Sequence, residues 1–273
     1  MNKNLDEIEW TIFDTETTGL EPQSGDRIVE IAAIRFKGRD QLAVFETLVN
    51  PQRPISPGAF QVNRISAEML KSAPCFENIA SEFLKFIQGS CLCSYNAGFD
   101  MEFLRNELKL AGREFPDSIT VLDVLKMARR LIPGLERYAL WFVAEKLEIK
   151  VGETHRALCD VKLTLGVFNK LKEVLKTKNL FEFKNFSELF SIDAAFLNNL
   201  NNHKIARIEE AIVLGVRLKI KYLSVSRAQV TERQVIPKEI RRERNSLYLV
   251  GHCCLRNEER SFRIDGILHL EII

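Results

Sequence analysis

Acidic side chains directly after a short apolar run constrain the fold and chemistry of this chain more than any other feature of its sequence. The run Trp10–Phe13 consists of strand-favouring residues and ends at Asp14, and Glu16 follows two positions later. Side chains i and i+2 of a strand share a face, so Asp14 and Glu16 can point toward the same ligand. A lone Asp-x-Glu more often ends a solvated strand, so this pair needs support from other residues.

Two further segments supply the same kind of side chain near the start of a helix. Asp100 follows the short apolar run Cys91–Tyr95 and opens a helical pattern that stops at Gly112. Asp160 begins an apolar helical stripe, and His155 precedes it in a loop. Each segment alone is ordinary, because acidic residues are favoured in the first turn of a helix. Together, four carboxylates suit two hard divalent cations, and a loop histidine can take a proton from an attacking water.

These five residues, in this order, resemble the histidine-type DEDD exonucleases, a DnaQ-like family that includes the proofreading ε subunits of bacterial replicative polymerases. The resemblance covers roughly residues 8–175 and rests on the runs Phe13–Leu20, Asn96–Asp100 and His155–Asp160. It implies a ribonuclease H-like α/β fold and removal of mononucleotides from a 3′ end with two divalent cations, Mg²⁺ or Mn²⁺. The family pattern assigns the metals to four carboxylates and the proton transfer to one histidine: Asp14, Glu16, Asp100, Asp160 and His155.

The same resemblance predicts which residues receive the terminal nucleotide. Leu20 is expected to be an apolar wedge against a base, and Val62 to lie beside the terminal base. The other expected contacts are Thr15, Thr17, Thr18, Gly19, Asn96 and Phe99. The chain departs from the family pattern at Asn63 and Arg64, where His-Gly is usual, and at Tyr95, where a His is usual. None of these departures removes a metal ligand, so they bear on substrate preference.

Length, hydropathy and cysteines narrow the class of protein. The chain has 273 residues and is 46% apolar, which is enough for one large or two moderate domains. Its N-terminus has no basic-then-apolar signal pattern, and no apolar run approaches the ~18 residues that span a bilayer. The six cysteines include no Cys-x-x-Cys pair, which argues against zinc and fits buried thiols in a reducing compartment. We therefore expect a cytoplasmic protein with no membrane partner.

The small net charge of +2 is distributed unevenly. Residues 204–273 hold 14 Lys and Arg against 9 Asp and Glu, a net charge of +5, and residues 1–203 have a net charge of −3. A catalytic half rich in carboxylates needs cations or a basic neighbour before it attracts a polyanion. The basic C-terminal part is the natural source of that attraction.

The C-terminal part has a different sequence character. The aromatic residues from Phe181 to Phe196 favour an amphipathic helix packed between domains, and the stretch Asn198–Asn202 is typical of a linker. We expect a helix from Lys204 to Gly215, followed by about five short strands, a pattern that predicts a small barrel. The expected domains are an exonuclease domain, a helical linker and a barrel domain: residues 1–175, 176–203 and 204–273.

Residues 204–272 resemble a WYL domain, the small SH3/Sm-like β-barrel frequent in bacterial transcription regulators. The matching segments include Lys219–Tyr222, Arg233–Pro237 and Arg260–Asp265, with Leu247 in place of the name-giving Trp. The resemblance implies a barrel that binds a ligand or nucleic acid. Its candidate contacts are Arg233, His252, Arg256, Arg260 and Arg263.

The whole sequence thus predicts a metal-dependent 3′–5′ exonuclease of single-stranded DNA whose WYL domain holds or senses nucleic acid. An RNA exonuclease is the alternative among enzymes. A regulatory protein whose WYL domain gates the nuclease in response to a ligand is the alternative from another class. A polymerase or a repair protein is compatible as a partner, and the sequence does not choose between them.

Overall fold

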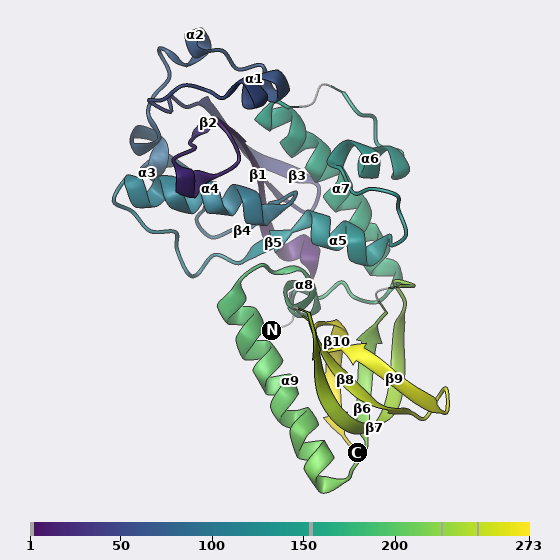
Figure 1. Cartoon of the computed structure of the whole chain (residues 1–273). Helices are drawn as coiled ribbons and strands as arrows, with labels where there is room; N and C mark the ends of the chain where they lie inside the picture. The colour runs from purple at the N-terminus through teal and green to yellow at the C-terminus, as the bar shows by residue number, and fades with distance from the viewer. Residues whose placement is uncertain (1–2, 153–154, 225, 245) are drawn as a thin grey trace.

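A five-stranded sheet forms the centre of the N-terminal part of the computed structural model, which describes residues 3–152, 155–224, 226–244 and 246–273 (Figure 1). The strand order is β3-β2-β1-β4-β5, with β1 antiparallel to β2 and parallel to β4. The strands are β1 (Glu9–Thr17), β2 (Ile28–Lys37), β3 (Asp40–Leu48), β4 (Cys91–Ser94) and β5 (Val121–Asp123). A mixed parallel and antiparallel sheet of this kind fits the α/β fold that the resemblance implied.

The buried residues of β1 explain its central place in the sheet. Trp10 and Ile12 point into a core cluster on one face, which includes Phe168 of α7 (Ala157–Thr177). Phe13 points into a second cluster on the other face, together with apolar residues of α3 (Phe76–Ile87) and α4 (Ala97–Leu110). Alternate residues of a strand face opposite ways. A strand with apolar side chains on both faces therefore needs packing partners on both, and helices supply them here.

Shorter elements connect the sheet to these helices. They are η1 (Leu5–Glu7), η2 (Pro22–Ser24), α1 (Pro57–Asn63), α2 (Ala67–Leu70), α5 (Val124–Leu131) and α6 (Leu140–Lys146). The helices α4 and α5 begin within a few residues of the carboxyl ends of β4 and β5. Those strands run parallel to β1, so polar residues at the three strand ends gather along one edge of the sheet.

The C-terminal part forms a second sheet of five antiparallel strands, in the order β10-β6-β7-β8-β9. The strands are β6 (Leu218–Leu223), β7 (Val230–Glu243), β8 (Ser246–Cys253), β9 (Glu258–Arg263) and β10 (Ile267–Ile272), with η3 (Ile264–Gly266) before the last. The five predicted strands are all present. In the described residues no pairing joins β9 to β10, so the structure shows a five-stranded sheet without closure into a barrel.

The prediction of a linker at Asn198–Asn202 is wrong. These residues belong to α9, which runs from Ala194 to Leu214 without a break. An asparagine in a helix costs only about 0.7 kcal/mol relative to alanine, and an existing helix extends with one hydrogen bond per added residue. The C-terminal half of α9 is fixed by packing, because Ile208 and Ala211 lie in the core of the second sheet.

A helix between the two sheets ties them into one body. In α8 (Phe183–Phe190), Phe186 and Phe190 are buried in the same core cluster as Leu223 and Leu268 of the second sheet. The amphipathic helix expected between the domains is therefore confirmed, and its apolar face is shared by both (Figure 1). Within the described residues, no helix combines the length and hydropathy needed to cross a membrane.

Candidate active site

Three of the four predicted metal-binding carboxylates lie together at the edge of the first sheet. Asp14 and Glu16 project from β1, and Asp160 projects from the first turn of α7. One oxygen from each lies within 4.8 Å of the others. The i, i+2 spacing on β1 and the packing of α7 against β1 and β2 produce this arrangement.

Asp100 is the fourth carboxylate, and it lies beside this group in a fixed orientation. Its Oδ1 accepts hydrogen bonds from the backbone N–H and the hydroxyl of Thr15, at 3.0 and 2.7 Å. Its Oδ2 accepts the hydroxyl of Ser94 at 2.5 Å. Thr15, expected only as a substrate contact, therefore also orients Asp100 against β1.

Neighbouring positive charges do not offset the negative charge of these four carboxylates. Burial and the charges of Asp100, Asp160 and Glu16 raise the pKa of Asp14 well above its usual value. Burial, followed by the charge of Asp160, raises the pKa of Glu16 to about 8. Burial raises the pKa of Asp100 to about 6 in spite of its hydrogen bonds. A positive charge placed among these groups would be strongly attracted.

His155 lies in the loop before α7, as predicted, and is exposed. Its backbone N–H donates to Oδ2 of Asp160 at 2.9 Å, and its own backbone is left-handed, with φ 62°. The next residue, Arg156, anchors this loop: its guanidinium donates to the buried carboxylate of Glu30, at 2.6 Å for the shortest contact. Glu30 also accepts the N–H of Ala157 at 2.9 Å. Sequence reasoning missed Glu30, although a single carboxylate among the apolar residues of a strand was an available signal, because buried charges are usually paired.

A pocket of about 660 Å³ opens next to Glu16. Leu20 and Val62 stand on its walls with 78% and 51% of their surface exposed. Its lining includes six of the eight predicted substrate contacts: Thr15, Thr17, Gly19, Leu20, Val62 and Phe99. The other two lie outside the lining: the hydroxyl of Thr18 donates to Asp26, and Asn96 caps α4 with φ 66°.

Two residues that sequence reasoning did not assign shape this pocket. Asp26 packs against Gly19, where a Cβ atom would approach its Oδ2 to 2.2 Å, so a larger residue would displace the Asp26 carboxylate from its bonds to Thr18 and Glu21. Asn63, noted only as a departure from the family pattern, is buried and donates to the carbonyl of Thr17 at 3.3 Å. The departure from the family pattern at position 63 was the signal available in the sequence. In the structure, Asn63 supports the loop that follows Thr17.

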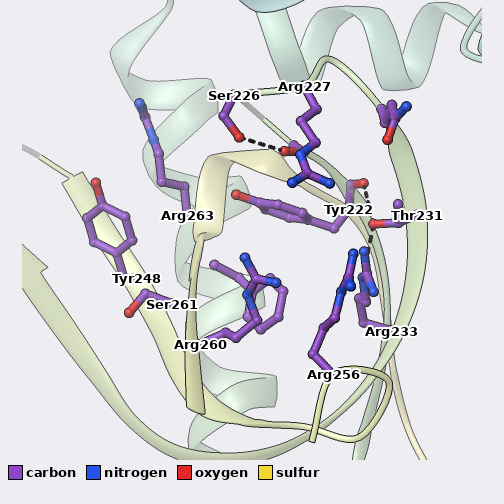
Figure 2. Close-up of a pocket in the computed structure, with 13 residues that line it drawn as sticks. Tyr222, Ser226, Arg227, Thr231, Arg233, Tyr248, Arg256, Arg260, Ser261 and Arg263 are labelled. Atoms are coloured by element: carbon purple, nitrogen blue, oxygen red, sulfur yellow. Dashed lines mark hydrogen bonds between the residues drawn. The ribbon is translucent and has the colours of Figure 1, made fainter. Parts of the chain in front are cut away.

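A second pocket, of about 530 Å³, lies on the C-terminal sheet (Figure 2). We call it the arginine pocket, because five arginines line it: Arg227, Arg233, Arg256, Arg260 and Arg263. Four of them were predicted, and Arg227, in the turn after β6, was missed. His252, the remaining predicted contact, is outside the lining, and its ring nitrogen lies 3.2 Å from the side-chain oxygen of Asn257. Nη1 of Arg233 is buried and contacts no hydrogen-bond partner among the described residues.

Comparison with known proteins assigns this fold and this acidic site to a class. A family model described as exonuclease matches residues 11–168, more than half of the chain, and a model described as WYL domain matches residues 203–272. The chain therefore belongs to the DnaQ-like exonuclease family, whose members are 3′–5′ exonucleases and hydrolases, and carries a C-terminal WYL domain.

Relatives named as DNA polymerase III proteins agree with this assignment. The PolC-type DNA polymerase III of Caldanaerobacter subterraneus is 38% identical over 186 residues, which are 68% of this chain and 13% of the polymerase. The DNA polymerase III ε subunit of Treponema pallidum is 40% identical over 166 residues, 60% of this chain and 76% of the subunit. The chain thus spans a small part of the polymerase and most of the subunit.

The E. coli exonuclease I structure with a dT13 oligonucleotide has a TM-score of 0.59 at 18% identity, over 89% of this chain and 55% of that one. The likeness in fold extends beyond the first sheet.

Proposed function

We propose that this protein removes nucleotides from the 3′ end of single-stranded DNA by metal-dependent hydrolysis. The observation that carries the proposal is the group of Asp14, Glu16 and Asp160, with oxygens within 4.8 Å, at the side of a pocket with two exposed apolar walls. The relatives support DNA as the substrate: one is a subunit of a DNA polymerase, and the solved exonuclease I holds a dT13 strand. RNA remains the alternative substrate.

The donor set fits two divalent cations, Mg²⁺ or Mn²⁺. Hard cations prefer carboxylate oxygens, and the pKa values of Asp14 and Glu16 are raised by burial and then by neighbouring negative charges that cations would offset. Asp14, Glu16 and Asp160 would hold the metals, and Asp100 would complete the site directly or through a water. When bound, the cations supply positive charge that favours formation of the nucleophile and offsets charge on the phosphate.

The protein's own residues then position the strand and move the proton. Leu20 and Val62 would pack against the terminal base, and the loop from Thr17 to Asp26 would receive the sugar. His155 would take a proton from the attacking water as the new oxygen–phosphorus bond forms and the bond to the 3′ oxygen breaks. The products are a nucleoside 5′-monophosphate and a strand one nucleotide shorter, whose 3′ oxygen takes up a proton.

We propose further that the WYL domain holds the strand at the arginine pocket. We assign this domain to residues 204–273 and propose that it has the form of a small barrel. Residues 1–175 would be the catalytic domain and residues 176–203 the helical connection. The arginine side chains offer forked donors that suit phosphate, and the unpartnered Nη1 of Arg233 is a donor that a phosphate could use. A strand held there meets the active site intramolecularly, which raises its effective concentration.

The catalytic proposal is tested by replacing one metal-binding carboxylate. Asp14→Ala should abolish Mn²⁺-dependent release of mononucleotides from a labelled strand while the melting temperature of the metal-free protein stays equal or rises, because a carboxyl group that is buried among Asp100, Asp160 and Glu16 is removed. Asp40→Ala is the matched control, since Asp40 is an exposed carboxylate of the same sheet and lies outside both the pocket and the metal-binding group. Near wild-type turnover of Asp14→Ala would show that this group is not the catalytic centre.

A further inference from the structure

Arg263 lines the arginine pocket, but its ion pair is at the junction of the two domains. Its Nε and Nη2 donate to the carboxylate of Asp265 at 3.1 and 2.8 Å. Arg130 of α5 donates to the same carboxylate and, through Nη1, to the backbone carbonyl of Asp265 at 3.0 Å. One carboxylate is therefore shared between an arginine of the pocket and an arginine of the exonuclease domain.

The junction has an excess of positive charge. The side chain of Arg130 is only 7% exposed, and that of Arg263 is 34% exposed. Lys126, also on α5, donates to the carbonyl of Ser191 at 3.0 Å, and burial followed by the charge of Arg130 lowers its pKa to about 8. The nearby Lys204 already has its own partner, Glu188. An added anion near Arg263 would thus reduce an existing repulsion.

We propose that a phosphodiester in the arginine pocket takes Arg263 from Asp265 and thereby strengthens the contact of Asp265 with Arg130. This inference rests on the proposed function, in which the pocket holds single-stranded DNA. Figure 2 shows the guanidinium of Arg263 turned away from those of the other four arginines. Asp265 holds it there, and rotation of this half-exposed side chain would bring its donors to a phosphate, which accepts a guanidinium as a carboxylate does.

The consequence is a link between strand binding and the domain contact. Once Arg263 has moved, Arg130 is the remaining arginine that pairs with Asp265. The side chain of Arg130 is buried, so water does not readily replace this ion pair. Linkage is reciprocal, so Arg130 must favour strand binding although it does not line the pocket. A held strand would therefore stabilise the position of the WYL domain against α5 of the exonuclease domain.

Fluorescence anisotropy of a labelled oligo-dT strand with the full chain, in EDTA to prevent cleavage, measures this link. Arg130→Met should weaken binding at least about fivefold more than Arg129→Met does, which is the lower end of typical coupling between linked sites. Arg129 is the matched control: it lies on the same helix, and its guanidinium stacks on the Tyr138 ring at 5.9 Å instead of contacting Asp265. Equal effects of the two substitutions would overturn the coupling.

Asp265→Asn gives an independent test, because it removes the charge and keeps the shape of the side chain. It also tests the proposal if Arg130→Met fails to fold. It should tighten binding about fivefold, because Arg263 is then free to turn toward the phosphate. In the Asp265→Asn background, Arg130→Met should cause no weakening beyond that of Arg129→Met. Unchanged or weaker binding by Asp265→Asn would overturn the proposal.

Arg233→Ala separates this inference from the proposed function. Weaker binding by Arg233→Ala with equal effects of Arg130→Met and Arg129→Met would overturn the coupling and leave the pocket as the strand site. Unchanged binding by Arg233→Ala would overturn the strand site and the coupling together, while the nuclease assay with Asp14→Ala would still stand.

Discussion

Glu16 shows how strongly the surroundings change a single side chain in this site. Its identity and its spacing from Asp14 were readable from the sequence, because strand alternation fixes which residues share a face. Its pKa of about 8 was not, because it results from burial in the folded protein and from the charges of Asp160 and Glu30. Both approach only after α7 and β2 have packed against β1.

This raised pKa predicts how the metal-free protein responds to pH. An acid whose pKa rises from its ordinary value of 4.5 to about 8 on folding contributes stability that is complete below 4.5 and is lost as pH rises through about 8. In EDTA, the melting temperature of the wild type should therefore fall between about pH 4.5 and pH 8 more than that of Glu16→Gln. Addition of Mn²⁺ should restore the wild type at the higher pH, since a bound ligand stabilises the folded state. Parallel pH curves for the two proteins would contradict this assignment.

His155 carries a second prediction at the residue scale. Its backbone contact to Asp160 would survive substitution, because the bond uses the N–H of the main chain. His155→Ala should therefore keep Mn²⁺ binding, measured by calorimetry, while turnover falls by about 10²–10⁴-fold, the usual contribution of a general base. A loss of metal binding equal to that of Asp160→Ala would make His155 a ligand or a structural residue instead.

At the scale of elements, the N-terminus of α7 is positioned by a strand 126 residues away in sequence. Glu30 of β2 holds both Arg156 and the N–H of Ala157, so the loop that carries His155 is fixed to the sheet. Glu30 lies opposite Glu16 in the β1–β2 register, which explains how one pair of strands can supply both a carboxylate of the acidic cluster and this support.

Arg156→Met should therefore lower kcat about tenfold, as for other groups that orient catalytic residues, with little change in KM. Arg35→Met is the control, because Arg35 forms an ion pair of the same length with Glu9, whose carboxylate is more exposed, at the far end of the same two strands. Steady-state kinetics of both variants check this expectation. A similar loss of kcat in Arg35→Met would indicate general loosening of the sheet.

Elements with strong local patterns were predictable from the sequence, and those set by distant contacts were not. The buried run at Trp10 and the apolar stripe after Asp160 specify β1 and α7 on their own. The polar stretch at Asn198 contains nothing that favours a helix, and it is helical as part of α9, whose C-terminal half packs in the core of the second sheet. Arg227 could not be assigned, because its place beside pocket residues of β7, β8 and β9 exists only in the folded sheet.

At the scale of the whole molecule, the shared core makes the two domains one unit. Leu223 and Leu268 are buried in the cluster that contains Trp10, and Arg130 is buried against Asp265. Removal of the WYL domain would expose this surface, so substitutions within the arginine pocket are the cleaner test of strand holding. Arg263 is best left intact, since it also takes part in the junction.

The triple substitution of Arg233, Arg256 and Arg260 by Ala should slow cleavage of long single strands and leave very short oligonucleotides almost unaffected, because the short ones need only the catalytic site. The slope of log affinity against log salt should become shallower by about 2, as expected for loss of three contacts to a single strand. The control replaces Lys219, Lys238 and Arg241, which pair with glutamates on exposed faces of the same sheet. The same salt slope in the triple variant and the wild type would rule out the pocket as the strand site.

The direction of digestion tests the central claim most directly. Single-stranded DNA and RNA of the same sequence, labelled at either end and with or without a 3′ block, would be incubated with the full chain and Mn²⁺. We predict release of the 3′-terminal mononucleotide first, faster cleavage of DNA than of RNA, resistance of the 3′-blocked strand and indifference to 5′ modification. Release of the 5′-terminal nucleotide first, or equal cleavage of the 3′-blocked strand, would contradict the assignment of a 3′–5′ exonuclease.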